Sequence, residues 1–379
     1  MRARGLQNSW EFDVLVGPVP SPDAFFNNLL DSSLGTSTIS TQLPAPASAV
    51  LPVASTRIAA LDWTKGALIL FMVAYHAINY SAFRPLAFRY LAFLPPSFIL
   101  ITGFLVGQVY AAKYDLRTWK PYMRLAIRGF KLFLIFLVLN IVHCILLERG
   151  VADGLWEFGG RSAAIFLSGN GREGIFEVLL PIAYFLMLAP LLLWLRSRGP
   201  RFVALCAAGV FLICLLLELN GKSSKNLGLL SAGTLGMTLG LISLDLLDAF
   251  ARGRLILTLF LYSAYRLCSF LWGETYPVQM FGATVSVLVL YCCAVRLHTE
   301  AWPGRQLVLL GQYSLLGYLA QIALLQAVIK IAGGKPQHSA GVIIVALPTA
   351  VFLFILIKAL HVVRRRSRIS DLAYKAVFA

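Results

Sequence analysis

The sequence predicts an all-α, polytopic integral membrane protein with about ten transmembrane helices and with both termini in the cytoplasm. Composition supports this fold class. Hydrophobic residues make up 59% of the 379 residues and charged residues only 13%, whereas soluble domains contain about 45–50% apolar and about 25% charged residues. The apolar residues also gather in separate stretches close to the roughly 20 residues that a helix needs to cross a bilayer.

Residues 1–56 differ from the rest of the chain. They are rich in Ser, Thr, Pro and Ala, as in residues 37–41 and 44–48, and they contain no long apolar run. They therefore predict neither a signal peptide nor a membrane span. Segments of this composition bury too little apolar surface to fold. We expect a largely disordered cytoplasmic tail.

Apolar stretches over residues 57–363 predict the transmembrane domain. Gly and Pro occur inside several of them, for example at Pro190, Gly236 and Pro348, and membrane helices tolerate these residues when neighbouring groups satisfy the backbone. The connection between the fifth and sixth stretches is short, at residues 218–226. The predicted spans are 58–80, 90–112, 124–147, 175–195, 202–219, 226–246, 254–272, 278–297, 306–332 and 340–363.

Basic residues set the predicted orientation. If the N-terminus is cytoplasmic, the loops on its side contain more Lys and Arg than the opposite loops, in agreement with the positive-inside rule. Residues 364–379 add a basic cytoplasmic tail on the same side. This bias also explains the formal net charge of +16. Because no nucleic-acid-binding motif accompanies the charge, we expect no nucleic acid partner.

The sequence predicts no metal site, no disulfide and no permanently bound cofactor. All six Cys lie within apolar stretches, and none forms a Cys-x-x-Cys pair or lies near a His at metal-ligand spacing. Cys residues in such settings pack as small hydrophobic residues. The sequence also lacks Gly-x-Ser-x-Gly, phosphate-loop and His-Glu-x-x-His motifs, so soluble-hydrolase chemistry is not expected.

The first predicted span carries polar residues on one face. Asp62 and Lys65 are three residues apart and are therefore neighbours on a helix. Lys65 and His76 are eleven residues apart, which puts them on nearly the same face and roughly 16 Å apart along the axis. A His inside a span usually faces a bundle interior or a wet cavity, and His is the usual proton-transfer group near neutral pH. The alternatives are a His satisfied within the core and an ordinary helix-end ion pair.

A second polar group lies on the third predicted span. Arg124, Arg128 and Lys131 are spaced i, i+4, i+7 and form one stripe on a helix. A basic stripe that descends into a helix bundle suits a phosphate-bearing ligand. Snorkelling of the same side chains to the membrane surface is the alternative.

Two further features suit a polar substrate. Residues 148–174 form the longest predicted loop, on the outer side, and combine paired charges, glycines and Trp156; an ordinary solvated loop is the alternative. Arg266 lies deep within the seventh predicted span, where it would pair with a carboxylate such as Glu177 or line a cavity.

Three stretches carry short motifs in a fixed order. The opening stretch, residues 61–76, contains Leu-Asp-Trp-Thr-Lys-Gly followed by His76. The second stretch, residues 97–110, contains Thr-Gly-Phe and then Gly-Gln-Val-Tyr. The third stretch, residues 310–321, contains Leu-Gly-x-x-Ser-Leu-x-x-Tyr-Leu. Their order and spacing resemble the acyltransferase-3 superfamily of integral membrane acyltransferases, and the second stretch is most similar to the branch that succinylates periplasmic glucans.

The resemblance implies a function. Members of that family move an acyl group from cytoplasmic acyl-CoA to a sugar acceptor on the far side of the membrane. It therefore implies an O-acyltransferase with acyl-CoA as co-substrate, a glycan acceptor, an acetyl or succinyl group, and a bacterial inner (plasma) membrane. His76 matches the catalytic His that acts as general base, and Asp62 and Lys65 match the Asp and Arg of the opening motif. The expected donor-binding residues are Lys65, Arg124, Arg128 and Lys131, and the expected acceptor or cavity residues are Asn79, Thr102, Trp156, Arg266 and Gln321.

Two positions depart from the family pattern. Lys65 stands in place of an Arg and lacks the bidentate fork that holds phosphate or carboxylate. Gln321 stands where many relatives have a second His. Each departure leaves open a different donor, reduced activity or a sister family without a transferase role.

The runner-up function is a membrane transporter or export component for a glycan, a lipid-linked solute or an anionic solute. It would use the same polar face without covalent chemistry. A structural membrane scaffold is the third alternative. The expected partners are the lipid bilayer, acyl-CoA, a glycan acceptor and, as one option for assembly, a second copy of the chain in a homodimer.

Overall fold

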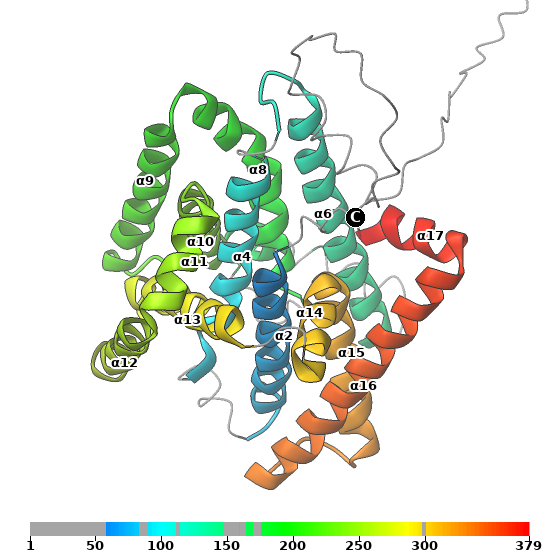
Figure 1. The fold of residues 1–379 in the computed structure, drawn as a ribbon. Coiled ribbons are helices and arrows are strands. Elements are labelled where there is room, and N and C mark those ends of the chain that lie inside the picture. Colours follow the sequence, from blue (N-terminus) through cyan, green and yellow to red (C-terminus); the bar gives the residue numbers. More distant parts are fainter. Residues whose placement is uncertain are drawn as a thin grey trace, which may run out of the picture. The chain divides into compact units, whose positions relative to one another are not determined.

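The chain folds into helices. Within the residues that the structure describes there are helices and no strands (Figure 1), which confirms the all-α prediction. These helices belong to one unit that begins at Ala59. The predicted disordered tail, residues 1–56, lies outside the described residues. The structure is a computed structural model, and it describes residues 58–82, 90–110, 114–147, 159, 164–169, 176–297 and 301–378.

Seven helices in these ranges are long and apolar enough to cross a membrane, or eight if one bent pair counts as a single span. They indicate a polytopic integral membrane protein. The number of ten spans and the cytoplasmic position of both termini stay predictions. The seven helices are α6 (Lys120–Leu147), α8 (Leu179–Arg198), α9 (Pro200–Leu219), α12 (Leu255–Trp272), α13 (Tyr276–Arg296), α15 (Ser314–Ile331) and α16 (Ser339–Arg366).

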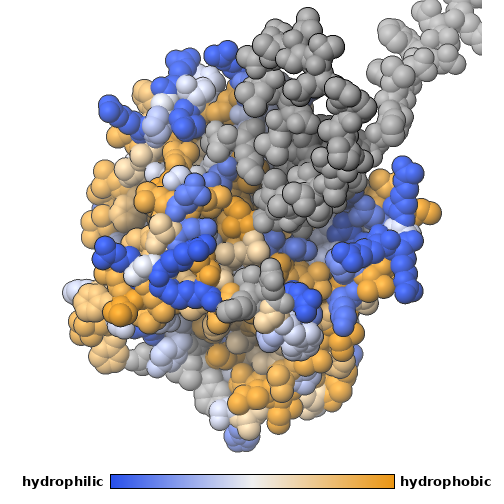
Figure 2. Space-filling view, in the orientation of Figure 1, coloured by the Kyte–Doolittle hydropathy of each residue, from blue (hydrophilic) through white to orange (hydrophobic). Residues whose placement is uncertain are grey.

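Large hydrophobic side chains lie on the surface of these helices. Leu205 on α9 and Phe260 and Phe270 on α12 are 67%, 69% and 68% exposed, and Figure 2 shows hydrophobic residues over much of the visible face. Soluble monomers rarely expose contiguous apolar surface on this scale. We infer that these helices face lipid.

The first two predicted spans form α2 (Ala59–Asn79) and α4 (Leu94–Leu105), and α4 continues as a π-helix, η2 (Val106–Tyr110). Neither is among the seven candidate spans. The mean hydropathy of α2 is lowered by Asp62, Lys65 and His76, and α4 together with η2 is shorter than a full span. Helix α4 has Pro in its first turn, where the missing backbone N–H needs no partner.

The sixth predicted span is bent. Helices α10 (Lys225–Leu239) and α11 (Leu244–Gly253) meet at an angle of 96°. In the bend, the side chain of Gln108 in η2 donates a hydrogen bond to the carbonyl oxygen of Ile242. Helix α11 also carries Asp245 among its apolar residues, and an amphipathic helix of this kind suits the membrane surface better than the bilayer core.

The ninth predicted span is broken at Tyr313 into α14 (Trp302–Gln312) and α15. One contact just before the break and one at Tyr313 itself accompany it. Gly311 packs against the carbonyl of Asp62 in α2, whereas the Tyr313 hydroxyl shares a hydrogen bond of 3.0 Å with Nδ1 of His361 on α16. Gly311 thus packs on α2 while Tyr313 is bonded to α16, and the chain changes direction between these two contacts.

Helices α4 and α10 approach each other so closely that their backbones are in contact. A Cβ atom on Gly236 would overlap the carbonyl of Leu100, and a Cβ atom on Gly103 would overlap that of Gly233. Small residues permit this kind of approach between membrane helices. Packing therefore accounts for the glycines of the second stretch.

The predicted basic tail contains a further helix, α17 (Arg368–Phe378), which follows α16 after one residue. Asp371 pairs with Arg364 at 2.5 Å and with Lys375 at 2.6 Å. The Arg364 guanidinium also lies 3.9 Å from the centre of the Tyr374 ring. These contacts dock α17 on the end of α16.

Acid pH is expected to release α17 from this position. The hydrogen bond from Lys375, together with the pairing with Arg364, holds the pKa of Asp371 below its ordinary value. Because the folded pKa is lowered, the contribution of Asp371 is complete above about pH 4 and is lost as the pH falls through the lowered folded value. Amide hydrogen exchange of residues 368–378, corrected for intrinsic rates, should be slow at about pH 7 and fast at about pH 2. The D371N variant should exchange fast at both, and equal protection of the unmodified chain at both would contradict the prediction.

Candidate functional site

Helix α2 is central to the described helices and presents a different face to each neighbour (Figure 1). Ile69 packs with residues of α14 and α16, Trp63 packs with residues of α13, and Met72 belongs to the main core with α4, α6 and α8. The helical period places Lys65 and His76 on the face between Ile69 and Met72. The polar face of α2 is therefore turned toward other helices.

Asp62 and Lys65 form the ion pair that their spacing predicts. Nζ of Lys65 lies 2.5 Å from the Asp62 carboxylate, and the two side chains are 18% and 10% exposed. Asp62 also lies in the first turn of α2, where the helix dipole favours an acidic group. The low exposure puts a cation at the edge of the bundle interior, where an anion interacts with it more strongly than in water.

The three stretches that the sequence singles out meet around α2. Gly311 of the third stretch packs on the backbone of Asp62 in the opening stretch. Phe98 of the second stretch lies beside Tyr318 of the third, with ring centroids 6.2 Å apart. Residues from distant parts of the chain therefore converge on one region, as a shared site requires.

His76 lies in the last turn of α2 with both ring nitrogens buried. Neither nitrogen has a hydrogen-bond partner among the described residues. The ring lies edge-on to Tyr75, with centroids 5.2 Å apart, and is stacked with Tyr80 at 6.3 Å. Buried polar atoms almost always have a partner. We infer that these nitrogens are free to contact a ligand.

Helix α15 runs parallel to α2, which fixes the level of its residues. Gly317 lies beside Ile69, and Leu325 packs in one cluster with Ala77. Residues on α15 are therefore level with those 248 positions earlier on α2. This places Gln321 three residues from the level of His76, or about 4.5 Å along the axis.

Gln321 is a second buried polar group at this level. It is 1% exposed, and both atoms of its amide group lack a hydrogen-bond partner within the described ranges. An unpaired buried amide costs about 1–3 kcal/mol. The two groups lie within one turn of each other along the helix axes, on neighbouring helices, and together they form a candidate site for a polar ligand.

Tyr318 is a residue of this region that the sequence analysis did not single out for the site. It is 7% exposed and interacts electrostatically with Glu177, Tyr75 and Tyr80. Its ring also packs edge-on against Phe176, at 6.1 Å. Its position in the motif of the third stretch was the signal in the sequence that could have identified it as a site residue.

Glu177 has a different partner from the one expected. It forms an ion pair with Lys225 at the start of α10 and lies within electrostatic reach of Tyr318. The sequence suggested Arg266 as its partner, but that residue stacks over Tyr90 at 5.1 Å. Spacing along the chain carries no information on such pairs between separate helices.

The predicted donor-binding arginines contact two tyrosines. Arg124 donates to the Tyr114 hydroxyl and Arg128 to the Tyr110 hydroxyl, each at 3.2 Å. The two tyrosine rings are stacked, with centroids 5.1 Å apart. Lys131 is half-buried on the same helix. The basic stripe of α6 thus lies where η2 ends, at the end of the second stretch.

The remaining predicted acceptor residues separate into different settings. The Asn79 side-chain oxygen is buried one turn after His76 and has no hydrogen-bond partner in the described part of the chain. Thr102 donates to a carbonyl of its own helix at 2.8 Å. Arg266 lies on α12 over the Tyr90 ring, and Trp156 lies outside the described residues. Asn79 therefore lies next to His76 on the same helix.

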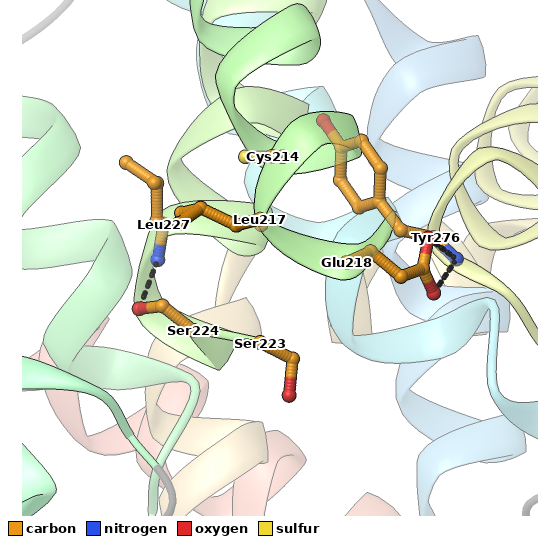
Figure 3. A pocket seen from close by; sticks show the side chains of 8 residues that line it. Cys214, Leu217, Glu218, Ser223, Ser224, Leu227 and Tyr276 are labelled. Carbon is orange, nitrogen blue, oxygen red and sulfur yellow. Dashed lines mark hydrogen bonds between the residues drawn. The ribbon is translucent and has the colours of Figure 1, made fainter. Parts of the chain in front are cut away.

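A small cavity of about 40 Å³ lies between the ends of α9, α10 and α13. Figure 3 shows the Glu218 carboxylate turned to the backbone nitrogen of Tyr276, from which it accepts hydrogen bonds of 2.9 and 3.2 Å. The Tyr276 hydroxyl lies 2.5 Å from Oγ of Ser231. These groups satisfy helix ends, and the cavity has room for water rather than a substrate.

Comparison with known proteins adds no assignment. No protein-family model, no curated protein and no solved structure matches this chain. Across the described ranges, no group of three or more His, Cys, Asp or Glu side chains could hold a metal ion. The function therefore has to be argued from the site.

Proposed function

We propose that the protein is a membrane O-acyltransferase that moves an acetyl or succinyl group from cytoplasmic acyl-CoA to a carbohydrate hydroxyl on the other side of the membrane. The proposal includes ten spans, cytoplasmic termini and a bacterial inner membrane. The observation that supports it best is the meeting of the three stretches around α2, beside His76, whose two ring nitrogens are buried and have no partner among the described residues.

His76 acts as general base in this proposal. One ring nitrogen accepts the proton of the acceptor hydroxyl while the hydroxyl oxygen forms a bond with the thioester carbonyl carbon. The bond between that carbon and the CoA sulfur then breaks, and the protonated ring returns its proton to the leaving sulfur. A base needs a nitrogen free to reach the hydroxyl proton. Asn79 and Gln321 hold further hydroxyls of the sugar, because Oδ1 of Asn79 and both amide atoms of Gln321 are buried without a partner in the described ranges.

The donor binds at the other end of α2. Lys65 lies on the same face as His76, roughly 16 Å away along the helix axis, and attracts a CoA phosphate as a point charge. Arg124, Arg128 and Lys131 contribute further cations. Stacking of Tyr110 and Tyr114 beside the arginines limits the motion of those side chains and lowers the entropy lost on binding.

Loss of a donor-binding cation is expected to weaken acyl-CoA binding. Lys65→Met and Arg128→Gln should each raise the dissociation constant about 10–100-fold, because hydrogen bonds to charged groups contribute about 1.5–3 kcal/mol. Lys65→Arg should retain binding, since the charge stays and a fork is gained. Titration of the purified full chain with acyl-CoA measures the effect, and Lys222→Met, at an exposed position, is the matched control. Unchanged affinity in Lys65→Met would remove Lys65 from the donor site.

A transporter is the second candidate. The bend between α10 and α11 and the break between α14 and α15 favour it, because discontinuous helices often line transport sites. An assay of the purified protein in proteoliposomes, which measures both CoA thiol release and glycan flux, distinguishes the two functions. An acyltransferase releases free CoA thiol only when acyl-CoA and a glycan acceptor are both present. Glycan flux without thiol release would support the transporter and overturn the acyltransferase.

A further inference from the structure

We propose that α17 is an interfacial helix that binds the anionic phospholipid headgroups next to the end of span α16. The inference is independent of the transferase proposal, because it rests on the two faces of α17, on the exposed basic residues around it and on its position.

One face of α17 is apolar and uncovered. Ile369, Leu372 and Val377 are 80%, 51% and 47% exposed. Ala373 and Ala376 are exposed as well, and the helical period places all five on one stripe. A stripe of this width, left bare on a short helix at the end of a span, matches helices that lie in the boundary between headgroups and acyl chains.

The opposite face of α17 is occupied by the protein itself. Asp371 pairs with Arg364, and the Tyr374 ring packs edge-on against Tyr313 with centroids 5.4 Å apart. Phe378 stacks with Tyr374 at 5.0 Å. The docked face thus contains Asp371, the acidic residue of α17, and the apolar stripe points away from the described helices.

The charges beside the stripe are positive and exposed. Arg365, Arg366 and Arg368 are all exposed, whereas Arg364 is paired with Asp371. Figure 2 shows hydrophilic and hydrophobic residues side by side at this end of the molecule, at the right of the view. Each basic residue near an anionic bilayer contributes about 1 kcal/mol of attraction. Phosphate groups of anionic lipids complement these three exposed arginines next to an apolar stripe.

The position of α17 favours lipid over other partners as the contact of its apolar stripe. Helix α16 is a candidate membrane span that ends at Arg366, and α17 starts two residues later. The stripe therefore begins at the height where a spanning helix leaves the bilayer. Snorkelling Arg and apolar side chains are both favourable at that height.

Amide hydrogen exchange of the full chain in nanodiscs tests the proposal. Residues 368–378 should exchange at least about tenfold more slowly in phosphatidylglycerol than in phosphatidylcholine. The triple variant R365Q/R366Q/R368Q should lose this difference. The matched control is R198Q/R201Q, which removes two exposed arginines at the end of α8 and the start of α9 and should keep it.

Three results would overturn the proposal. Equal exchange in both lipids would mean that α17 is held by its contacts with α16 and Tyr313 alone. Protection that rises with protein concentration, whatever the lipid, would mean that a second copy covers the stripe. Loss of the lipid difference in the control as well as in the triple variant would assign the effect to total charge rather than to this helix.

Discussion

Replacement of His76 by phenylalanine is expected to lower the rate of acyl transfer about 10²–10⁴-fold, the range that general-base assistance contributes. The loss should appear in kcat, because the ring acts on the acceptor proton in the transition state and holds no part of the donor. Release of CoA thiol by the purified protein, with saturating acyl-CoA and acceptor, measures it.

The same substitution should leave the fold intact. Both ring nitrogens of His76 are buried without a partner among the described residues, so phenylalanine, a ring of similar size, removes no hydrogen bond to those residues. Replacement of an unsatisfied buried polar group by an apolar one is neutral or stabilising. The thermal unfolding midpoint should therefore stay the same or rise. A structural His would give the opposite pattern, with a lower midpoint and little change in rate.

His338 provides the matched control. It is an exposed His before α16 that makes no side-chain cap hydrogen bond there, so His338→Phe should change neither the rate nor the midpoint. If His76→Phe releases CoA as fast as the unmodified chain, the general-base role is wrong, and the transporter becomes the better proposal.

Much of the helical architecture could be predicted from the sequence because apolar length alone marks a helix that crosses a bilayer. The spacing of Asp62 and Lys65 likewise predicted their ion pair, since residues three apart on a helix must be neighbours. Both inferences are local. They need only the residues of one helix and its solvent.

The path of the chain between helices could not be predicted in the same way. An apolar run that includes Tyr313 reads as one long span, yet the helix breaks there, where Gly311 and Tyr313 contact different neighbours. The bend after α10 depends on Gln108, which reaches the Ile242 carbonyl from 134 positions away. The hydropathy of a segment measures its preference for an apolar environment. It does not indicate which neighbouring helix the segment contacts.

The candidate site also contains some residues whose placement follows from local spacing and others whose placement does not. Lys65 and His76 could be placed on one face of α2 from their spacing. The level of Gln321 relative to His76, the proximity of Tyr318 and the pairing of Glu177 with Lys225 depend on how separate helices pack. Arg266 could be singled out for its depth in a span, but its contacts with the rings of Tyr90 and Tyr265 could not be predicted from that depth.

Replacement of Gly236 by alanine is expected to destabilise the protein by about 1–3 kcal/mol or more, as overpacking does in tight interfaces. The added Cβ would overlap the Leu100 carbonyl, which is backbone and cannot change rotamer. Helices α4 and α10 would have to separate. A lower thermal unfolding midpoint of the purified chain measures the effect.

Gly209→Ala is the control that makes this prediction specific. Gly209 lies in the middle of α9, and a Cβ there would meet no atom within 4 Å. Alanine is the better helix former by about 0.5–1 kcal/mol, so this variant should be as stable as the unmodified chain or more stable. The two substitutions are chemically identical and differ only in what surrounds the new methyl group. If both variants unfold at the same temperature, α4 and α10 are not in backbone contact, and the glycines of the second stretch need a reason other than packing.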